Sequence, residues 1–311
     1  MKTAFVFPGQ GSQSPGMQAE LADAFPVVRD VYREASDILG RDLWGLAQAG
    51  PEAALDLTEN TQPVMLCAGI AAWRVWIGAG GTQPATMAGH SLGEYSALVA
   101  AGALSFESAV SLVADRGRFM QEAVEEGSGA MAAILGLEDD AVREACAAAG
   151  DEGVVEAVNF NAPGQVVIAG ERRAVESAVE KAQQAGARRA ILLPVSVPSH
   201  CALMEPAAER LAESLRAARM DAPIIPVVNN VDVECVTEPA AIADALVRQL
   251  YRPVRWVETI RRFADDGIER VVECGPGRVL TGLGKRIDRT LPHVALDTPA
   301  AVNGLLEETE E

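Results

Sequence analysis

A serine stands between two glycines in the run MAGHSLGEY, residues 87–95, which contains the pattern G-x-S-x-G around Ser91. In that pattern a serine on a sharp turn from a strand into a helix exposes its hydroxyl for nucleophilic attack. The pentapeptide alone is a weak signal, because Gly and Ser are common residues. The flanking elements strengthen it: residues 85–88 form a short apolar strand, and residues 92–101 favour a helix that stops at Gly102. We therefore predict that Ser91 is a nucleophile.

A nucleophilic serine needs a base near neutral pH, and the chain has three histidines. His90 adjoins Ser91, so its side chain leaves the turn in another direction. His293 lies in a predicted terminal strand, where a packed or exposed histidine is ordinary, whereas His200 lies on a loop at the edge of the main domain. This placement favours His200. No acid between residues 91 and 200 stands out as a third member, so either one of them or a backbone group orients the imidazole.

Arg116 lies among apolar residues on one face of a helix predicted over residues 105–120, whereas Arg118 lies on the opposite face with Ser111 and Asp115. A buried guanidinium needs a partner, because its desolvation is costly. Two partners remain open. One is an acid of the protein in a structural ion pair, and the other is a substrate carboxylate, which the planar guanidinium can bind through two parallel hydrogen bonds.

The elements that must hold these residues alternate between strands and helices, beginning with a buried strand over residues 3–7. Residues 127–196 have the order β-α-β-β-α-β, which is that of a ferredoxin-like unit. This unit is predicted from strands at 131–137, 154–160, 165–170 and 187–195 and helices at 139–149 and 173–185. We therefore expect an α/β fold in two parts. Residues 1–126 and 197–311 form a hydrolase-like core with a parallel sheet and a nucleophile elbow, and residues 127–196 form an inserted ferredoxin-like domain.

Composition argues against several classes of partner. The chain of 311 residues carries a net charge of −18, which disfavours nucleic acid. Its five cysteines are scattered and never spaced C-x-x-C, which predicts reduced thiols and no metal site. The apolar run before Pro8 is too short for a signal peptide, and no stretch of the sequence has the unbroken apolar length of a membrane span. We expect a cytoplasmic protein without a membrane partner.

Eight motifs in register resemble the malonyl-CoA:acyl carrier protein transacylases of type II fatty acid synthesis. They are FVFPGQGSQSPGM at 5–17, TQP at 61–63, GHSLGEY at 89–95, ADRGRFM at 114–120, NAPGQ at 161–165, VPSHCALM at 197–204, LYRPVRW at 250–256 and ECGPGRVLTGL at 273–283. The likeness runs from residue 5 to about residue 290. VPSH matches the free-standing bacterial enzymes and differs from the YASH and HAFH signatures of polyketide-synthase domains.

The resemblance implies roles for named residues. Ser91 would be the nucleophile and His200 the base, while Gln10 and the backbone N–H of Leu92 would form the oxyanion hole. A backbone carbonyl in the stretch 249–251, assigned here to Gln249, would orient the histidine.

The resemblance also implies the substrate contacts and the partners. Arg116 would hold the malonyl carboxylate, with Gln62 lining the site. The substrates would be malonyl-CoA and acyl carrier protein, handled by a monomer without a cofactor through a malonyl-serine intermediate. Three alternatives remain: the malonyl transferase of malonate decarboxylase, a serine thioesterase or other hydrolase, and a non-catalytic module that binds carrier protein.

A cluster of basic residues near the C-terminus is the candidate docking surface. Carrier proteins of this pathway are acidic, so a chain with a net charge of −18 must offer them a local basic patch. The patch predicted here comprises Arg278, Lys285 and Arg286, unless these residues form an ordinary solvated helix face. Arg188 and Arg189 on the inserted domain are the alternative.

Overall fold

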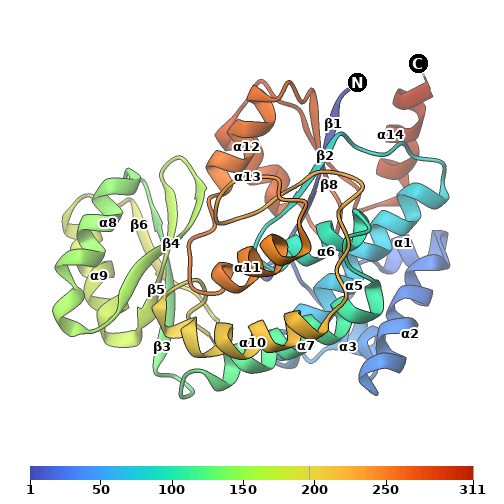
Figure 1. Cartoon of the computed structure of the whole chain (residues 1–311). Helices are drawn as coiled ribbons and strands as arrows, with labels where there is room; N and C mark the ends of the chain where they lie inside the picture. The colour runs from blue at the N-terminus through green and yellow to red at the C-terminus, as the bar shows by residue number, and fades with distance from the viewer. Residues whose placement is uncertain (196, 311) are drawn as a thin grey trace.

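The computed structural model describes residues 1–195 and 197–310 and contains two sheets that lie side by side (Figure 1). The larger sheet has five strands in the order β7-β2-β1-β8-β9, and all its neighbouring strands are parallel. Its strands are β1 (Thr3–Phe7), β2 (Thr86–Gly89), β7 (Val227–Val228), β8 (Arg270–Glu273) and β9 (His293–Ala295). The predicted α/β fold with a parallel sheet is thus confirmed.

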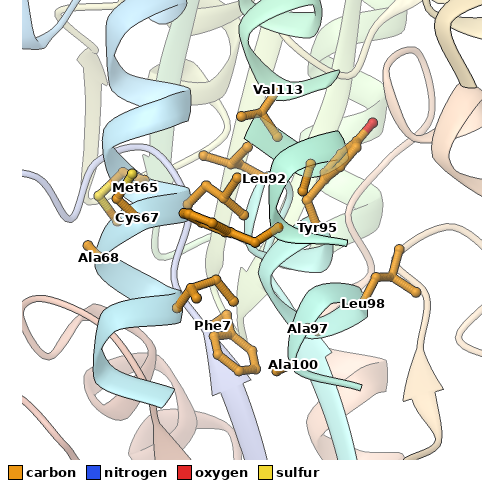
Figure 2. Packing of buried hydrophobic residues seen from close by; sticks show 14 of the residues in the cluster. Phe7, Met65, Cys67, Ala68, Leu92, Tyr95, Ala97, Leu98, Ala100 and Val113 are labelled. Carbon is orange, nitrogen blue, oxygen red and sulfur yellow. The ribbon is translucent and has the colours of Figure 1, made fainter. Parts of the chain in front are cut away.

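Helices cover both faces of this sheet, because successive side chains of β1 point into two different cores. Phe5 and Phe7 pack into the larger core, and Ala4 and Val6 into the other. Figure 2 shows Phe7 packed between two helices of the larger core, α5 and α6.

The larger core is enclosed by α1 (Ala19–Ala24), α2 (Val27–Leu39), α3 (Leu43–Ala49), α4 (Glu52–Leu55), α5 (Thr58–Gly78), α6 (Gly93–Ala100), α7 (Phe106–Glu122), α10 (Glu205–Ala217), α11 (Pro239–Gln249) and α14 (Pro299–Glu310). The opposite core is enclosed by α12 (Trp256–Asp265) and α13 (Val279–Ile287). A short 3-10 helix, Ala202–Met204, precedes α10.

The smaller sheet is antiparallel, with the order β4-β5-β3-β6. It comprises β3 (Gly129–Leu135), β4 (Val155–Ala162), β5 (Gln165–Glu171) and β6 (Arg189–Leu192). One face packs on α8 (Asp139–Ala148) and α9 (Arg172–Gln184) around a core of its own, and a 3-10 helix, Gly150–Glu152, follows α8. The other face, which includes Met131 and Val167, contacts Cys201 and Leu203 of the larger part.

The strand predicted over residues 187–195 is shorter than expected, since β6 covers only Arg189–Leu192. Pro194 lacks the N–H that a continued ladder would use, and this accounts for the early end of the strand. The last residue of the predicted insert, Ser196, lies outside the described residues.

In the part of the chain that the structure describes, no helix has the length and apolar character needed to span a bilayer.

The carboxyl ends of three neighbouring strands meet at one edge of the parallel sheet. There β1 leads to Gln10, β2 to Ser91 and β7 to Asn230. In open α/β sheets this edge is where ligands bind. The order of the strands therefore brings together residues that are far apart in the sequence.

Candidate active site

Ser91 lies on the tight turn between β2 and α6 and has a φ of 52°. Such a conformation is costly for a residue with a side chain, so the surroundings must impose it. A Cβ on Gly89 would lie 1.8 Å from the carbonyl carbon of Gly93, and a Cβ on Gly93 would lie 2.0 Å from the Phe7 oxygen. Both glycines of the pattern are therefore needed for backbones to approach this closely.

Asn230 fixes the Ser91 turn from the neighbouring strand β7. The backbone N–H of Ser91 donates to Asn230 Oδ1 at 2.7 Å, and Asn230 Nδ2 donates to the Gly89 oxygen at 2.6 Å. Asn230 is fully buried, so these two bonds are shielded from water. The turn that presents Ser91 is therefore held from both sides of the serine.

His200 contacts Ser91 directly, with Nε2 at 2.7 Å from Ser91 Oγ. Its Nδ1 lies 2.6 Å from the backbone oxygen of Gln249. Because a carbonyl oxygen only accepts, Nδ1 carries the proton and Nε2 is free to accept from the serine hydroxyl. Burial, followed by the nearby charge of Arg116, lowers the pKa of His200 to about 3. The imidazole is therefore neutral, and a carbonyl rather than an acid orients it.

The other two histidines have different partners. His90 Nε2 lies 2.8 Å from Asn161 Oδ1, and the ring meets that of Trp256 edge-on with centroids 5.3 Å apart. His293 lies in β9 and packs closely against Gly284. Within the described residues neither histidine is hydrogen-bonded to Ser91, so the sequence-based choice of His200 agrees with the geometry.

Arg116 is buried, with 1% of its surface exposed, and its guanidinium points at the serine. Its Nη2 donates to Gln249 Oε1 at 3.0 Å and lies 3.4 Å from Ser91 Oγ. Its Nε has no hydrogen-bond partner within the described part of the chain, and no ion pair with a carboxylate is found there. A neutral amide thus replaces the structural ion pair considered from the sequence. Arg118, by contrast, is exposed and pairs with Asp115 at 2.7 Å.

The loop after β1 packs against the Ser91 turn, backbone to backbone. A Cβ on Gly9 would lie 2.5 Å from the His90 oxygen and 3.6 Å from the Leu92 nitrogen. No hydrogen bond of the Gln10 or Leu92 backbone N–H is found among the described residues. Two neighbouring donors beside a nucleophile are what a developing oxyanion requires.

A cavity of about 100 Å³ opens on Ser91, and both sheets contribute to its walls. The core supplies Gln10, His90, Ser91, Leu92, Arg116, Met120, Val197, Ser199 and His200, and the smaller sheet with its following segment supplies Met131, Asn159, Leu193 and Val195. The cavity is small and mainly apolar, with one guanidinium in its wall. It therefore suits a short acyl chain that carries a negative charge.

Gln62 does not line this cavity, contrary to the expectation from the sequence. It is buried in α5, and its Nε2 donates to Met120 Sδ at 3.4 Å. Met120 lines the cavity in its place. Gln62 therefore supports the cavity wall from behind, because the thioether of Met120, and not the amide, faces the cavity.

Two buried side chains at the site were not predicted from the sequence. Asn230 follows β7, a strand of only two residues, and Glu94 lies in the first turn of α6. The pair Asn229-Asn230 after an apolar run and an acid three residues after the serine were the available signals.

Within the described residues, no group of three or more His, Cys, Asp or Glu side chains could hold a metal ion.

Known proteins similar to this chain identify its family. The sequence pattern of the acyl transferase domain matches residues 4–306. The chain belongs to the acyl transferase family. It is 58% identical to the malonyl CoA-acyl carrier protein transacylase of Salmonella typhimurium, over 97% of this chain and 98% of that one. The enzyme of the same name from Bacillus subtilis is 45% identical over 100% and 98% of the two chains.

Solved structures of acyl transferases agree with this assignment. An acyl carrier protein S-malonyltransferase from Vibrio cholerae has a TM-score of 0.95 and 55% identity, over 98% of this chain and all of that one. A malonyl-transacylase solved in complex with a type II PKS acyl-carrier protein has a TM-score of 0.98 and 55% identity, over 99% and 100% of the two chains.

In this acyl transferase the basic residues considered for docking lie in two settings. Arg278 pairs with Asp297 at 2.8 Å. Arg286 instead donates to Gln165 and, together with Arg188 and Arg189, lines a cavity of about 400 Å³ between α13 and the smaller sheet. Arg286 of one predicted patch therefore lines the same cavity as both arginines of the other, whereas Arg278 and Lys285 do not line it.

Proposed function

We propose that the chain transfers a malonyl group from malonyl-CoA to the phosphopantetheine thiol of an acyl carrier protein through an ester on Ser91. Membership of the family and the names of its relatives support both the donor and the acceptor. The observation that carries the mechanism is the position of Ser91 Oγ, 2.7 Å from His200 Nε2 and 3.4 Å from Arg116 Nη2. A nucleophile with a base on one side and a guanidinium on the other suits an acyl group that bears a carboxylate.

The reaction proceeds in two balanced halves. Ser91 Oγ attacks the thioester carbonyl and gives its proton to His200 Nε2, and the negative oxygen accepts from the N–H groups of Gln10 and Leu92. Each of these donors is worth about 3 kcal/mol in such a site. The C–S bond then breaks, and the leaving CoA sulfur takes the proton from His200.

In the second half the carrier thiol gives its proton to His200 and attacks the ester, and Ser91 regains its hydroxyl. The exchange of a thioester for an ester and back requires no external energy source, so we assign no cofactor to it. Arg116 holds the malonyl carboxylate through both halves.

The fold divides this work between two parts. The core of residues 1–126 and 197–311 is hydrolase-like and carries Ser91 on a nucleophile elbow, which its positive φ and flanking glycines support. Residues 127–196 form a ferredoxin-like insert, supported by the strand order β4-β5-β3-β6 and by two helices on one face.

The carrier protein docks between these two parts. Arg188, Arg189 and Arg286 converge there, with Lys285 adjacent on α13, and they offer positive charge on a molecule with a net charge of −18. An acidic partner is steered to such a local patch. Arg278 contributes less, because Asp297 neutralises it.

The enzyme acts as a cytoplasmic monomer that binds neither nucleic acid nor membrane. One chain supplies the nucleophile, the base and the guanidinium. All five cysteines are free, which fits a reducing compartment. The net charge of −18 opposes binding to nucleic acid.

Mass spectrometry of the intact protein after incubation with malonyl-CoA tests the function. Wild type and His293→Ala should each gain one malonyl group, located on Ser91, and pass it to carrier protein. Ser91→Ala should gain none, and His200→Ala should lose most of the activity. Release of free malonate with no stable ester would identify a hydrolase instead.

A further inference from the structure

Glu94 is a buried carboxylate one helical turn after Ser91, and the mechanism above does not use it. Only 2% of its surface is exposed. Its Oε2 accepts from Gln249 Nε2 at 2.8 Å and from the backbone N–H of Asn230 at 3.0 Å. Burying a carboxylate is costly unless its acceptor oxygens are used. Both contacts of Glu94 are to residues that in turn hold the reacting groups.

Gln249 connects Glu94 to the nucleophile, the base and the guanidinium. Its Oε1 accepts from Arg116 at 3.0 Å, and its Nε2 donates to the Ser91 backbone oxygen at 3.0 Å as well as to Glu94. Its backbone oxygen receives the Nδ1 proton of His200. The side chain of one fully buried glutamine therefore lies between a guanidinium and a carboxyl group.

Only one orientation of the Gln249 amide satisfies these neighbours. Arg116 can only donate a hydrogen bond. Burial raises the pKa of Glu94 to about 7, but its Oε2 already accepts from the Asn230 N–H and is therefore the acceptor in either protonation state. The amide oxygen must therefore face Arg116 and the amide nitrogen must face Glu94. Without an acceptor at position 94, the nitrogen would keep only the Ser91 oxygen, and the Gln249 side chain would be held by two hydrogen bonds instead of three.

The second contact of Glu94 supports the nucleophile. It holds the backbone of Asn230, whose side chain accepts from Ser91 N–H and donates to the Gly89 oxygen. Removal of the carboxylate would leave the Asn230 N–H buried without a partner. A buried donor left unpaired costs about 1–3 kcal/mol and tends to move toward another acceptor.

We propose that Glu94 is a positioning residue: through Gln249 it aims Arg116 at the acyl carboxylate, and through Asn230 it holds the Ser91 turn. This inference rests on the proposed function, because the aim of Arg116 matters only if the acyl group carries a carboxylate. It predicts that an acceptor oxygen at position 94 sets the preference for malonyl over acetyl groups.

The test compares Glu94→Gln, which keeps the shape and an acceptor oxygen, with Glu94→Met, which keeps the length and has no acceptor oxygen. The readout is kcat/KM for malonyl-CoA divided by that for acetyl-CoA. We expect Glu94→Met to lower this ratio by roughly 10- to 100-fold, as expected for losing a hydrogen bond to a charged group. Glu94→Gln should restore it to within about threefold of wild type.

A matched control is Glu273→Met. Glu273 is also a buried carboxylate that accepts from backbone N–H groups, those of Leu280 at 3.0 Å and Thr281 at 2.7 Å, but it lies outside the cavity. Its loss should reduce stability and leave the malonyl-to-acetyl ratio unchanged. An equal loss of both donors in Glu94→Met, or the same fall in ratio in Glu273→Met, would overturn the proposal.

A further variant and the wild type itself cover the remaining outcomes. If Glu94→Met does not fold, Glu94→Asp withdraws the carboxylate by one methylene group and should lower the ratio by a smaller factor. An unchanged ratio in Glu94→Asp would then overturn the proposal. A wild-type protein that forms no malonyl-serine at Ser91 would instead overturn the proposed function itself, a result seen before any variant is compared.

Discussion

The hydroxyl of Ser91 has two polar neighbours, one that accepts a hydrogen bond from it and one that donates to it. His200 Nε2 accepts its proton at 2.7 Å, while Arg116 Nη2 points at the same oxygen from 3.4 Å. An oxygen that accepts from a cation gives up its own proton more readily, because hydrogen bonds in a chain polarise one another. Proton transfer from Ser91 to His200 would therefore start from a hydrogen bond that already exists.

Replacement of Arg116 should separate substrates that carry a carboxylate from those that do not. Arg116→Ala should lower kcat/KM for malonyl-CoA by about 10²- to 10³-fold, since a desolvated charged pair is worth about 3–4 kcal/mol. Acetyl-CoA, which lacks the carboxylate, should lose far less. Steady-state rates with the two donors measure this, and a parallel drop for both in a folded variant would reduce Arg116 to a structural role.

The lowered pKa of His200 has a consequence for stability. Its value of about 3 in the folded protein lies below the ordinary value of 6.5, so between these limits the unfolded chain binds a proton that the native state does not. Stability from this residue is thus complete above about pH 6.5 and falls as the pH drops, by about 1.4 kcal/mol per pH unit.

Urea unfolding of wild type and His200→Ala at pH 5, 6 and 7 measures this effect. The free energy of unfolding of wild type should decline more steeply toward low pH than that of the variant. Identical slopes would mean that His200 takes up a proton as readily in the native state as in the unfolded chain, and the lowered pKa of the buried imidazole would then be wrong.

At the scale of elements, one strand, one turn and one helix present the nucleophile, and the glycines on both sides permit their close approach. The backbone of α6 begins against the end of β1, as the distance of 2.0 Å from a Cβ on Gly93 to the Phe7 oxygen makes clear. Leu92 and Tyr95 then anchor α6 in the larger core (Figure 2). The position of Ser91 therefore depends on backbone packing as much as on its own side chain.

Gly93→Ala should disturb this packing. We expect a loss of about 1–3 kcal/mol in the free energy of unfolding, because the added methyl group meets backbone that cannot yield easily. The rate of malonyl-serine formation should fall as well, since the turn must shift. Chemical denaturation and a single-turnover assay measure the two effects.

The matched control for this change is Gly282→Ala in α13. A Cβ at Gly282 would meet no atom within 4 Å, so this variant should gain about 0.5–1 kcal/mol in stability and keep its rate. A Gly93→Ala protein with the stability and rate of wild type would show that the close approach of α6 and β1 is dispensable.

Local patterns predicted the parts of the site whose signals lie within a few residues. Glycines on both sides marked Ser91, and a place on an apolar helical face marked Arg116; the structure brings both to one cavity. Asn230 and Glu94 could not be predicted in this way, because they meet only across 136 residues of chain. Sequence also could not show that Met120 would separate Gln62 from the cavity, since that depends on how α5 and α7 pack.

At the scale of the whole molecule, an acidic protein must recognise an acidic partner. Three arginines, Arg188, Arg189 and Arg286, line one cavity where the smaller sheet meets α13. This arrangement was hidden in the sequence, where the residues lie about a hundred positions apart and looked like two competing patches. The fold brings them together, and repulsion at long range can thus coexist with attraction at one place.

Reversal of charge in the cavity lined by Arg188, Arg189 and Arg286 should weaken the docking of carrier protein without affecting the reaction with malonyl-CoA. Arg189→Glu combined with Arg286→Glu should raise the KM for carrier protein severalfold and leave malonylation by malonyl-CoA unchanged. The wild-type KM should itself rise with salt, because screening weakens the attraction.

Arg29→Glu with Arg33→Glu provides the control, because it makes the same change in charge on α2, at the opposite side of the molecule (Figure 1). This control variant should leave the KM for carrier protein near the wild-type value. An equal rise in both double variants would indicate a general effect of net charge and would argue against a defined docking surface.

The cavity wall is formed by both parts of the protein, so the preference for an acyl group can change without a change in the reacting residues. Met131 and Leu193 border the acyl space from the smaller sheet and its following segment, whereas Ser91 and His200 come from the core. Selection can therefore enlarge or reshape the acyl space through substitutions that leave the reacting atoms untouched. Substitutions at positions 131 and 193 alone are therefore a small set of variants in which to search for enzymes that accept branched or longer malonyl derivatives. Ser91 and His200 would stay unchanged in all of them.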